Sequence, residues 1–416
     1  MKVLILNTSE RTGGAAIAAN RLMKALRKEG VDVGMLVKNK QTDNPDVFTC
    51  NESFWKRKIN YIRFVWERIV IFLYNKFDRK NLFRVSIANT GTDISDYKIV
   101  KDADIIHLHW INQGFLSLRD IKRLLMLNKP VVWTMHDMWP CTGICHHARE
   151  CMAYRDKCSS CFYLNRGENK DLSTWIYTKK KTLYANVGIV FVTCSRWLAG
   201  LVWQSSLCKD KEIFSIPNPI DTSVFRQLSQ KECRSRLGLP LDKKLLLFGA
   251  QNITDKQKGI DYLYKALPFI HIENIELVIF GYIKSEMRDR LPFKIHPMGY
   301  LNDEDSIVAL YNAADVFITP SLEENLPNTI MESMACGTPC VGFNIGGIPE
   351  MIDHKVNGYV AGYKDANDLA TGITWVLENP QIQTLSRACI DKVEKNYSEK
   401  VVAEKYISLY KELLDK

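Results

Sequence analysis

The fold is decided by Ser321-Leu-Glu-Glu-Asn-Leu-Pro-Asn-Thr-Ile-Met-Glu-Ser-Met-Ala335, a polar loop that leads into a helix. The apolar run Asp315–Ile318 before it is typical of a buried strand, and Pro327 suits the first helical position. A helix that starts just after a strand presents backbone N–H groups, here those of Asn328 and Thr329, to an anion such as a diphosphate. The stretch therefore predicts a strand–loop–helix unit of an α/β fold, with an anion site at the helix start.

Two glutamates flank this helix start. Glu324 lies in the loop, and Glu332 lies more than one turn inside the predicted helix. Carboxylates accept hydrogen bonds from hydroxyl groups, which a nucleotide-sugar presents on its ribose and on its sugar. A single glutamate is usually a solvated surface charge. The strand-end and helix context favours the binding interpretation for this pair.

Short apolar runs alternate with helix-period segments along most of the chain. Continuous apolar runs suit parallel strands that are buried on both faces, and such alternation predicts a doubly wound α/β fold. The predicted strands are Val3–Leu6, Val31–Val37, Asp104–His107, Val131–Trp133, Gly188–Val192, Leu245–Phe248, Glu276–Phe280, Asp315–Ile318 and Pro339–Phe343.

The alternation occurs in two blocks, and a chain of 416 residues is too long for one ordinary core. Two prolines and an asparagine interrupt the pattern in Ile216–Asp221. We therefore expect two doubly wound, Rossmann-like domains, over 1–212 and 213–395, facing a cleft at the carboxyl ends of their strands. No strand follows the last helix, 396–416, and its packing back on the first domain is left open.

The composition fits a globular protein, since 46% of the residues are hydrophobic, 25% are charged and the net charge is +9. The positive excess suits an acidic ligand such as a nucleotide diphosphate, or an anionic membrane surface, and no nucleic-acid-binding signature accompanies it. The segment Met1–Asn7 lacks the longer apolar stretch and the cleavage site of an export signal. We expect a cytoplasmic protein, with a position at the inner face of the membrane left open.

The second block resembles the family 4 retaining glycosyltransferases, which have the GT-B fold. Their mark is a glutamate, seven residues and a second glutamate, and this chain continues Glu324 and Glu332 with Ser-Met-Ala-Cys-Gly-Thr-Pro-Cys-Val341. The segments Gly346–Glu350 and Asn357-Gly358 follow, as in that family. The resemblance runs from the first residue to about residue 410.

The resemblance implies a role for each half of the chain. The first domain would be the acceptor side and the second the nucleotide-sugar donor domain. Glu332 would bind the ribose hydroxyls of the donor, and Glu324 would face the donor-sugar hydroxyls beside the reacting carbon. These roles are implied by the resemblance and not by the spacing of the glutamates.

A glycine pair, Gly13 and Gly14, follows the first predicted strand and opens a helix. Glycine lets the backbone approach a phosphate closely, and the helix start supplies N–H donors. Taken alone, two adjacent glycines fit a plain tight turn equally well. Members of the family carry a similar loop over the donor phosphate or the acceptor.

Histidines lie where two predicted strands end, at His109 and at His136, which Asp137 follows. A lone histidine is more often a structural residue, but the carboxyl ends of parallel strands form the expected rim of an active site. The resemblance places His109 near the donor sugar, and His136 and Asp137 near the acceptor.

The donor phosphates need a cation, because the leaving group departs as a nucleotide diphosphate. Lys258, before Gly259, matches the lysine of the family pattern, whereas Ala250 or Gln251 occupies the position of its usual arginine. Lys256 or Arg11 could replace that arginine. The alternative is an exposed lysine loop without a role in binding.

Four cysteines, Cys145, Cys151, Cys158 and Cys161, lie close together in the sequence, and the last two form a Cys-x-x-Cys pair. Thiolates at such spacing can form a structural zinc site or hold an iron–sulfur cluster. His146 or His147 could substitute for one ligand. A cysteine-rich loop without metal remains an equal alternative.

The segment Lys56–Arg84 is both basic and apolar. It could lie on an anionic membrane near a lipid-linked acceptor. The alternative is a core helix with a solvated basic face.

With the resemblance, these residues predict a glycosyltransferase that moves a hexosyl group from a UDP- or GDP-sugar to a hydroxyl acceptor with retention. The acceptor would be a glycan or a lipid-linked glycan in bacterial polysaccharide or glycolipid synthesis. No cofactor is required for catalysis if Lys258 and helix N-termini stabilise the diphosphate. The alternatives are a nucleotide-sugar epimerase on the same fold and a nucleotide-sugar-binding protein without transfer activity.

Overall fold

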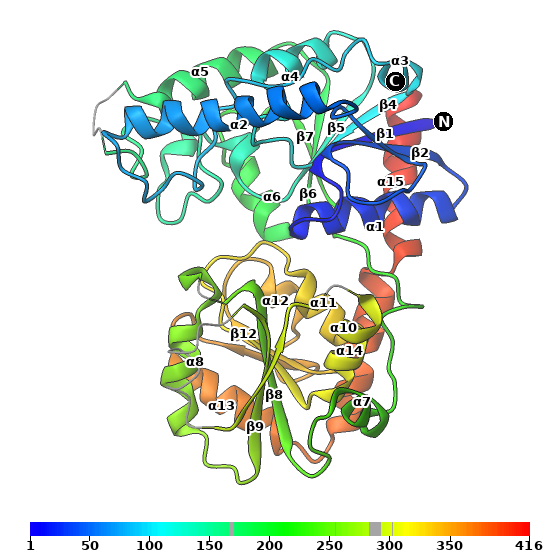
Figure 1. Ribbon diagram of the computed structural model, residues 1–416, viewed down its shortest axis with the longest axis vertical. Helices are drawn as coiled ribbons and strands as arrows, with labels where there is room; N and C mark the ends of the chain where they lie inside the picture. The colour runs from blue at the N-terminus through cyan, green and yellow to red at the C-terminus, as the bar shows by residue number, and fades with distance from the viewer. Residues whose placement is uncertain (166–169, 254, 283–292, 302) are drawn as a thin grey trace. The chain divides into compact units, whose positions relative to one another are not determined.

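The computed structural model describes residues 1–165, 170–253, 255–282, 293–301 and 303–416. Its chain divides into two compact units, and Figure 1 shows a parallel sheet with helices packed around it in each. The first unit is Met1–Pro217 together with Val402–Lys416, and the second is Asn218–Val401.

The first unit holds a seven-stranded sheet in the order β3-β2-β1-β4-β5-β6-β7, in which every pair of neighbours is parallel. Its strands are β1 (Lys2–Ser9), β2 (Asp32–Asn39), β3 (Val47–Thr49), β4 (Ile105–Leu108), β5 (Val131–Met135), β6 (Ile189–Thr193) and β7 (Glu212–Ser215). Its helices are α1 (Gly14–Lys28), α2 (Phe54–Tyr74), α3 (Lys98–Asp102), α4 (Leu118–Leu125), α5 (Leu172–Tyr184) and α6 (Arg196–Trp203), with short 3-10 turns at Trp139–Cys141 and Ala153–Arg155.

Each face of this sheet has its own core. Leu4 and Leu6 of β1 pack into one buried cluster, and Val3 and Ile5 pack into another. Successive side chains of a strand point to opposite faces, so the alternation places one cluster on each side of the sheet. Burial on both faces is the reason that the strand sequences are continuously apolar.

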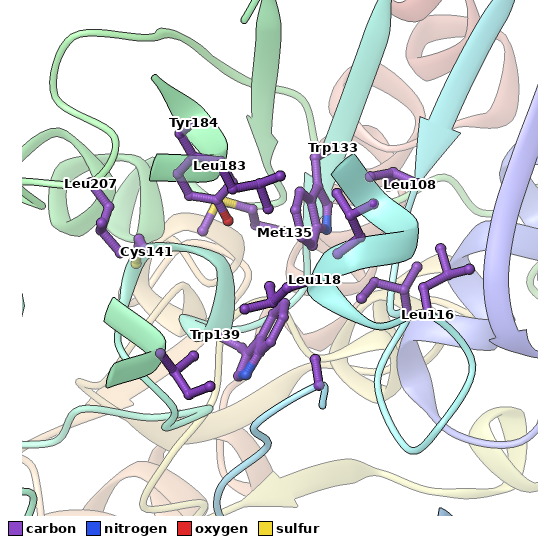
Figure 2. Packing of buried hydrophobic residues seen from close by; sticks show 14 of the residues in the cluster. Leu108, Leu116, Leu118, Trp133, Met135, Trp139, Cys141, Leu183, Tyr184 and Leu207 are labelled. Carbon is purple, nitrogen blue, oxygen red and sulfur yellow. The ribbon is translucent and has the colours of Figure 1, made fainter. Parts of the chain in front are cut away.

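One of these cores is rich in aromatic side chains. Figure 2 shows Trp133 and Met135 of β5 in this core together with Trp139 and Tyr184. The ring centroids of Trp133 and Trp139 lie 6.0 Å apart. Trp133 also donates its indole N–H to the carbonyl oxygen of His109 at 3.0 Å. The core therefore holds the backbone at the carboxyl end of β4.

The last helix, α15 (Glu399–Leu414), packs on the first unit from Val402 onward. Tyr406 and Tyr410 lie in the core that also contains residues of α1, and Figure 1 shows α15 in red beside α1 and β1. The Tyr406 hydroxyl hydrogen-bonds Thr134 at 2.8 Å, and the Tyr410 hydroxyl hydrogen-bonds Nδ1 of His107 at 2.7 Å. Two tyrosine hydroxyls of α15 thus provide hydrogen-bond partners for buried polar side chains of β4 and β5.

The second unit holds a six-stranded sheet in the order β10-β9-β8-β11-β12-β13, again with parallel neighbours. Its strands are β8 (Lys244–Asn252), β9 (Ile275–Tyr282), β10 (Ile295–Gly299), β11 (Val316–Thr319), β12 (Cys340–Phe343) and β13 (Gly358–Ala361). Its helices are α7 (Gln230–Leu237), α8 (Ile260–Ala266), α10 (Glu304–Ala313), α11 (Asn328–Ala335), α12 (Ile348–Met351), α13 (Ala366–Leu377) and α14 (Ile382–Asn396), with short 3-10 turns at Lys256–Lys258 and Leu267–Phe269.

The predicted α/β class with two doubly wound parallel sheets is confirmed. All nine predicted strands are present, and four further strands, β3, β7, β10 and β13, were not predicted. These four are the edge strands of the two sheets. An edge strand has a neighbouring strand on one side only and is less enclosed than an interior strand. Its sequence therefore does not need a long apolar run.

Candidate functional site

Two loops of the second unit lie side by side because the strands before them are neighbours. β8 and β11 pair in parallel, with Phe248 opposite Ile318, so the loops that follow leave the same edge of the sheet. The Leu322 N–H of the β11–α11 loop donates to the Gln257 carbonyl of the β8–α8 loop at 2.8 Å. The pairing of the strands therefore brings Lys258 into reach of the loop that carries Glu324.

Gly259 makes the close approach of these loops sterically feasible. Its φ is +73°, and a Cβ atom at this position would lie 1.7 Å from the Pro320 carbonyl oxygen. A side chain here would be strained by the backbone conformation and would collide with the neighbouring backbone. The glycine after Lys258 thus has a structural reason that the sequence pattern alone did not reveal.

Lys258 and Glu324 form an ion pair, with 2.5 Å between the Lys258 ammonium and Oε1 of Glu324. The Glu324 carboxylate raises the pKa of Lys258, so the ammonium stays charged at neutral pH. Gly346 packs against the backbone of the same loop, since a Cβ there would lie 1.7 Å from the Glu324 carbonyl oxygen. The structure thus brings together two of the predicted site residues, Lys258 and Glu324. Gly259 and Gly346 both pack closely against the backbone of the loop that carries Glu324.

The helix that follows, α11, begins at Asn328, with Pro327 as its N-cap rather than as its first helical residue. Pro327 has an extended backbone, with ψ of 120°, and no side chain caps the helix. The Asn328 side-chain oxygen accepts a hydrogen bond from Asn218 at 3.3 Å. Thr329 occupies the first turn. A helix start without a side-chain cap favours an anion by its N–H groups and its dipole.

Glu332 lies on α11 and is largely buried, with 8% of its surface exposed. Its Oε2 accepts a hydrogen bond from the Tyr311 hydroxyl at 3.1 Å. Burial, followed by the nearby Glu332 carboxylate, raises the pKa of Tyr311 well above its usual value, so the phenol remains a donor. Tyr311 was missed at the sequence level, because a tyrosine of an apolar helix carries no signal of a polar partner on another helix.

In the first unit, the glycine pair opens α1 at the carboxyl end of β1. Gly13 is the N-cap of α1 with φ of +93°, and Gly14 is the first helical residue. The Gln41 side chain holds the loop before them, since its Oε1 accepts from the Arg11 N–H and the Thr12 hydroxyl, at 2.9 and 3.1 Å. The positive φ explains the glycine at position 13.

Two predicted site residues of the first unit, His109 and His136, are in direct contact. Nδ1 of His109 and Nε2 of His136 lie 2.9 Å apart, so one ring N–H donates to the other ring nitrogen. Burial lowers the pKa of His136 to about 4, and burial together with the neighbouring imidazoles lowers the pKa of His109 further below its usual value. Both rings are therefore neutral near pH 7.

The two buried histidines of β4 and its end differ in one respect. His107 is hydrogen-bonded at both nitrogens, to Thr134 at 2.7 Å and to Tyr410 at 2.7 Å. Nε2 of His109 has no hydrogen-bond partner among the described residues, and its atom is buried. A buried polar atom without a partner is costly unless a ligand or water satisfies it. His107 is therefore a structural residue, whereas Nε2 of His109 can still form a hydrogen bond with a ligand or a water molecule.

Asp137 is held by its own neighbours. Its Oδ2 accepts from the Trp110 indole at 2.9 Å and lies 2.7 Å from Nδ1 of His146, and its Oδ1 accepts from the Trp139 N–H at 2.8 Å. Burial would raise the pKa of Asp137, but the His146 imidazole and these hydrogen bonds lower it to about 2. The ionised Asp137 carboxylate thus holds the backbone just after β5 in place through its hydrogen bonds. His146 is one of its partners.

The cysteine cluster does not form a metal site in the part of the chain that the structure describes, where no group of three or more His, Cys, Asp or Glu side chains is arranged to hold a metal ion. All four thiols are free, and Cys145 and Cys158 are buried. The Gly143 N–H donates to the Cys158 sulfur at 3.1 Å. The interpretation of Cys145, Cys151, Cys158 and Cys161 as metal ligands therefore has no support from their geometry.

A separate apolar hollow lies between α4 and α5 and contains none of the predicted site residues. Leu118, Leu125, Ile176 and Leu183 are among the residues that line it. His109, His136 and Asp137, whose pKa values are lowered, lie elsewhere, just after β4 and β5. The hollow is therefore distinct from the candidate site.

Two family models match the chain, one in each half. The model described as "Glycosyltransferase Family 4" matches residues 12–224, and the model described as "Glycosyl transferases group 1" matches residues 242–379. The first match alone covers more than half of the chain. The second contains Lys258, Glu324 and Glu332.

Relatives of the chain have similar descriptions. An uncharacterised glycosyltransferase of Methanocaldococcus jannaschii is 26% identical over 361 residues, which are 80% of this chain and 90% of that protein. The N-acetyl-alpha-D-glucosaminyl L-malate synthase of Bacillus anthracis is 24% identical over 218 residues, which are 49% of this chain and 55% of that protein.

Solved structures share the fold over the whole chain. The sucrose-phosphate synthase of Thermosynechococcus elongatus matches with a TM-score of 0.68 at 18% identity, over 100% of this chain and 99% of that one. An Anabaena protein crystallised with UDP and glucose matches with a TM-score of 0.64 at 15% identity, over 99% of this chain and 100% of that one. The two sheets thus have the GT-B fold. The chain belongs to glycosyltransferase family 4, a family of retaining hexosyltransferases, and acts on nucleotide-sugar donors.

Proposed function

We propose that this enzyme transfers a hexosyl group from a UDP-sugar to a hydroxyl of a lipid-linked glycan, with retained anomeric configuration. The bond between the anomeric carbon and the diphosphate oxygen breaks, and UDP leaves. A new bond forms between that carbon and the acceptor oxygen, whose proton is released. Negative charge therefore develops on the leaving diphosphate.

The observation that carries the proposal is the ion pair of Lys258 with Glu324, just before the start of α11. Lys258 is a cation held in place by a carboxylate, and the start of α11 lies four residues beyond Glu324. A fixed cation and a helix N-terminus together stabilise a departing diphosphate without a metal ion. In this proposal Glu324 also accepts hydrogen bonds from the donor sugar. Asn328 and Thr329 bind the diphosphate.

Glu332 is proposed to bind the ribose. Its Oε2 accepts from Tyr311, which fixes the carboxylate, and a carboxylate can accept several hydrogen bonds, one of them from a ribose hydroxyl. The relatives favour uridine as the base, because an Escherichia coli relative is named a UDP-Gal-dependent galactosyltransferase and the Anabaena structure contains UDP. These descriptions belong to the relatives and support the choice of UDP here.

The first unit is proposed to contribute the remaining groups. Nε2 of His109 would hydrogen-bond a hydroxyl of the transferred sugar, and Gly13 and Gly14 would let the backbone approach the donor phosphate or the acceptor. His136 holds the His109 ring at 2.9 Å and is proposed, with Asp137, to border the acceptor. The names of two relatives include acceptors linked to diphosphoundecaprenol, which supports a lipid-linked acceptor.

The test separates donor binding from transfer. Thermal shifts are measured with UDP-, GDP- and ADP-sugars, and transfer is then measured with the donor that stabilises the protein. Glu324→Gln is expected to retain stabilisation by UDP and to lose transfer by roughly a hundredfold or more. Glu332→Gln is expected to weaken the stabilisation itself. Glu323→Gln, a change at the adjacent glutamate, serves as the matched control and keeps both properties.

Two outcomes would overturn the proposal. Wild-type transfer in Glu324→Gln would remove the residue from the reaction. Release of a free epimer of the donor sugar in the absence of any acceptor would instead identify the chain as an epimerase.

A further inference from the structure

The helix α2 buries mainly polar residues and exposes large apolar ones, the opposite of a usual surface helix. Its buried residues are Asn60, Glu67, Arg68 and Ile71, of which three are polar or charged. A surface helix normally buries an apolar stripe and exposes polar residues. The helix packs on the core through Ile71, Val70 and Tyr74, but most of its other large apolar side chains are exposed.

Two of the buried polar residues of α2, Glu67 and Arg68, bond backbone groups of the loop that follows. Oε1 of Glu67 accepts from the N–H groups of Ile87 and Ala88 at 2.8 and 2.9 Å. Arg68 donates to the Val85 carbonyl at 3.0 Å and forms an ion pair with Glu67 at 2.7 Å. Buried charged groups that lose such partners are costly, so these contacts fix the rotation of the helix about its axis.

The opposite face of α2 carries a stripe of large apolar side chains exposed to solvent. The spacing between successive members is four, three, four, three and four residues, which places them along one face of a helix. The most exposed is Trp55 at 73%, and the least exposed is Ile69 at 39%. We define the apolar stripe as Trp55, Ile59, Ile62, Trp66, Ile69 and Leu73.

Basic side chains surround the apolar stripe at both of its ends. No acidic side chain is exposed from Phe54 to Lys80, because Glu67 is buried and Asp78 is half-buried. The neighbouring Phe77, which follows the helix, is 68% exposed. The exposed cations of this segment are Lys56, Arg57, Lys58, Lys76, Arg79 and Lys80.

We propose that the apolar stripe of α2 is a lipid-contacting surface by which the first unit binds an anionic membrane. An interfacial helix has tryptophans and aliphatic residues on one face and lysines and arginines next to it, and its apolar face enters the boundary between headgroups and acyl chains. Within the described part of the chain, no helix combines the length and the hydrophobicity that a membrane crossing needs. α2 therefore lies in the plane of the membrane surface.

Charge decides between the membrane and a second copy of the chain. A symmetric contact between two copies would bring the six exposed cations of each segment toward those of the other. The exposed acid just before the helix, Glu52, already pairs with Lys56 of its own chain at 2.6 Å. An anionic lipid surface attracts these cations instead of repelling them. The proposal does not depend on the transfer reaction, since none of these residues belongs to the candidate site.

The experiment is flotation of the full-length protein with vesicles of phosphatidylcholine alone and of phosphatidylcholine mixed with phosphatidylglycerol. Wild type is expected to bind the mixed vesicles, and added salt weakens this binding. The double variant Ile62→Gln/Trp66→Gln is expected to bind them roughly tenfold or more weakly, because two exposed apolar side chains that would enter the membrane are lost. Trp203→Gln is the matched control, because Trp203 is 57% exposed and Trp66 is 53% exposed in the same unit.

A second variant tests the charges. Lys56→Gln/Arg57→Gln/Lys58→Gln is expected to reduce binding to the mixed vesicles by roughly tenfold or more. Any binding to phosphatidylcholine alone should be the same in this variant as in wild type. The far-UV circular dichroism and the melting temperature of each variant show that it is folded. Transfer to a water-soluble acceptor should stay at the wild-type level, which separates this result from a failure of the proposed function.

Three results would overturn the proposal. One is wild-type binding by the Ile62→Gln/Trp66→Gln variant. Another is an equal loss in Trp203→Gln. The third is a wild-type protein that ignores all vesicles and forms a dimer that the double variant abolishes, because that result assigns the apolar stripe to a second copy of the chain.

Discussion

The Lys258–Glu324 pair at the carboxyl end of the second sheet and the His109–His136 pair at that of the first are held in opposite ways. In the second unit, Lys258 and Glu324 are both charged and form an ion pair whose lysine side chain is 36% exposed. In the first unit, His109 is buried and His136 is half-buried, both rings are neutral, and they share one hydrogen bond. Charge is kept where solvent or a partner supports it, and it is suppressed where burial removes water. The difference suits a diphosphate at the second unit and uncharged hydroxyls at the first.

The largest expected effect comes from removing Lys258, the cation of the ion pair with Glu324. Lys258→Met should lower kcat by roughly a hundredfold to a thousandfold, because the leaving diphosphate loses a fixed positive charge and Glu324 loses its partner. Lys256→Met, two residues earlier on the same 3-10 turn, is the matched control and should have a small effect. Steady-state kinetics with the cognate UDP-sugar measure both. Equal losses in the two variants would mean that the charge of the whole loop acts, rather than one positioned lysine.

A smaller loss of activity is expected from a change in the neutral histidine pair, His109 and His136. His109→Phe removes the ring nitrogen that has no partner among the described residues, and kcat/KM should fall by roughly tenfold to a hundredfold. His107→Phe removes a ring whose nitrogens bond Thr134 and Tyr410, so it should lower the melting temperature more than the kcat/KM of the folded enzyme. Kinetics and calorimetry on both variants make the comparison. A His109→Phe enzyme with full activity would make His109 as structural as His107.

The free energy of unfolding should also depend on pH, with opposite signs for the histidines and for Lys258. His107 and His136 have pKa values near 3 and 4 in the folded protein and an ordinary value of 6.5, so protons bind the unfolded chain first. The free energy of unfolding should therefore fall from about pH 6.5 to about pH 4, by roughly 1 kcal/mol per pH unit for each histidine. Lys258 has a raised pKa, so its contribution is present below its ordinary value of 10.5 and is lost at higher pH.

Calorimetry across acid and alkaline pH distinguishes these contributions. His136→Asn should flatten the acid slope and leave the alkaline one unchanged, whereas Lys258→Met should change only the alkaline side. An unchanged acid slope in His136→Asn would show that the folded protein does not lower the pKa of this ring.

The candidate site shows what could be predicted and what could not. Lys258 and Glu324 were both identified from strand-end loops and from the resemblance, but their contact at 2.5 Å depends on Gly259 and on the pairing of β8 with β11. Tyr311, the partner of Glu332, carried no signal, because its helix reads as apolar. The roles of these residues in binding and transfer stay predictions that the variants above test.

The sequence by itself determined the nine interior strands and the alternation with helices, because burial on both faces demands long apolar runs that are visible without a structure. The four edge strands, β3, β7, β10 and β13, were decided by tertiary pairing, since a strand covered on one side needs no such run. The rotation of α2 was decided in the same way. Its composition fits a core helix as well as a surface one, and only the partners of Glu67 and Arg68 in the folded chain turn the apolar stripe outward.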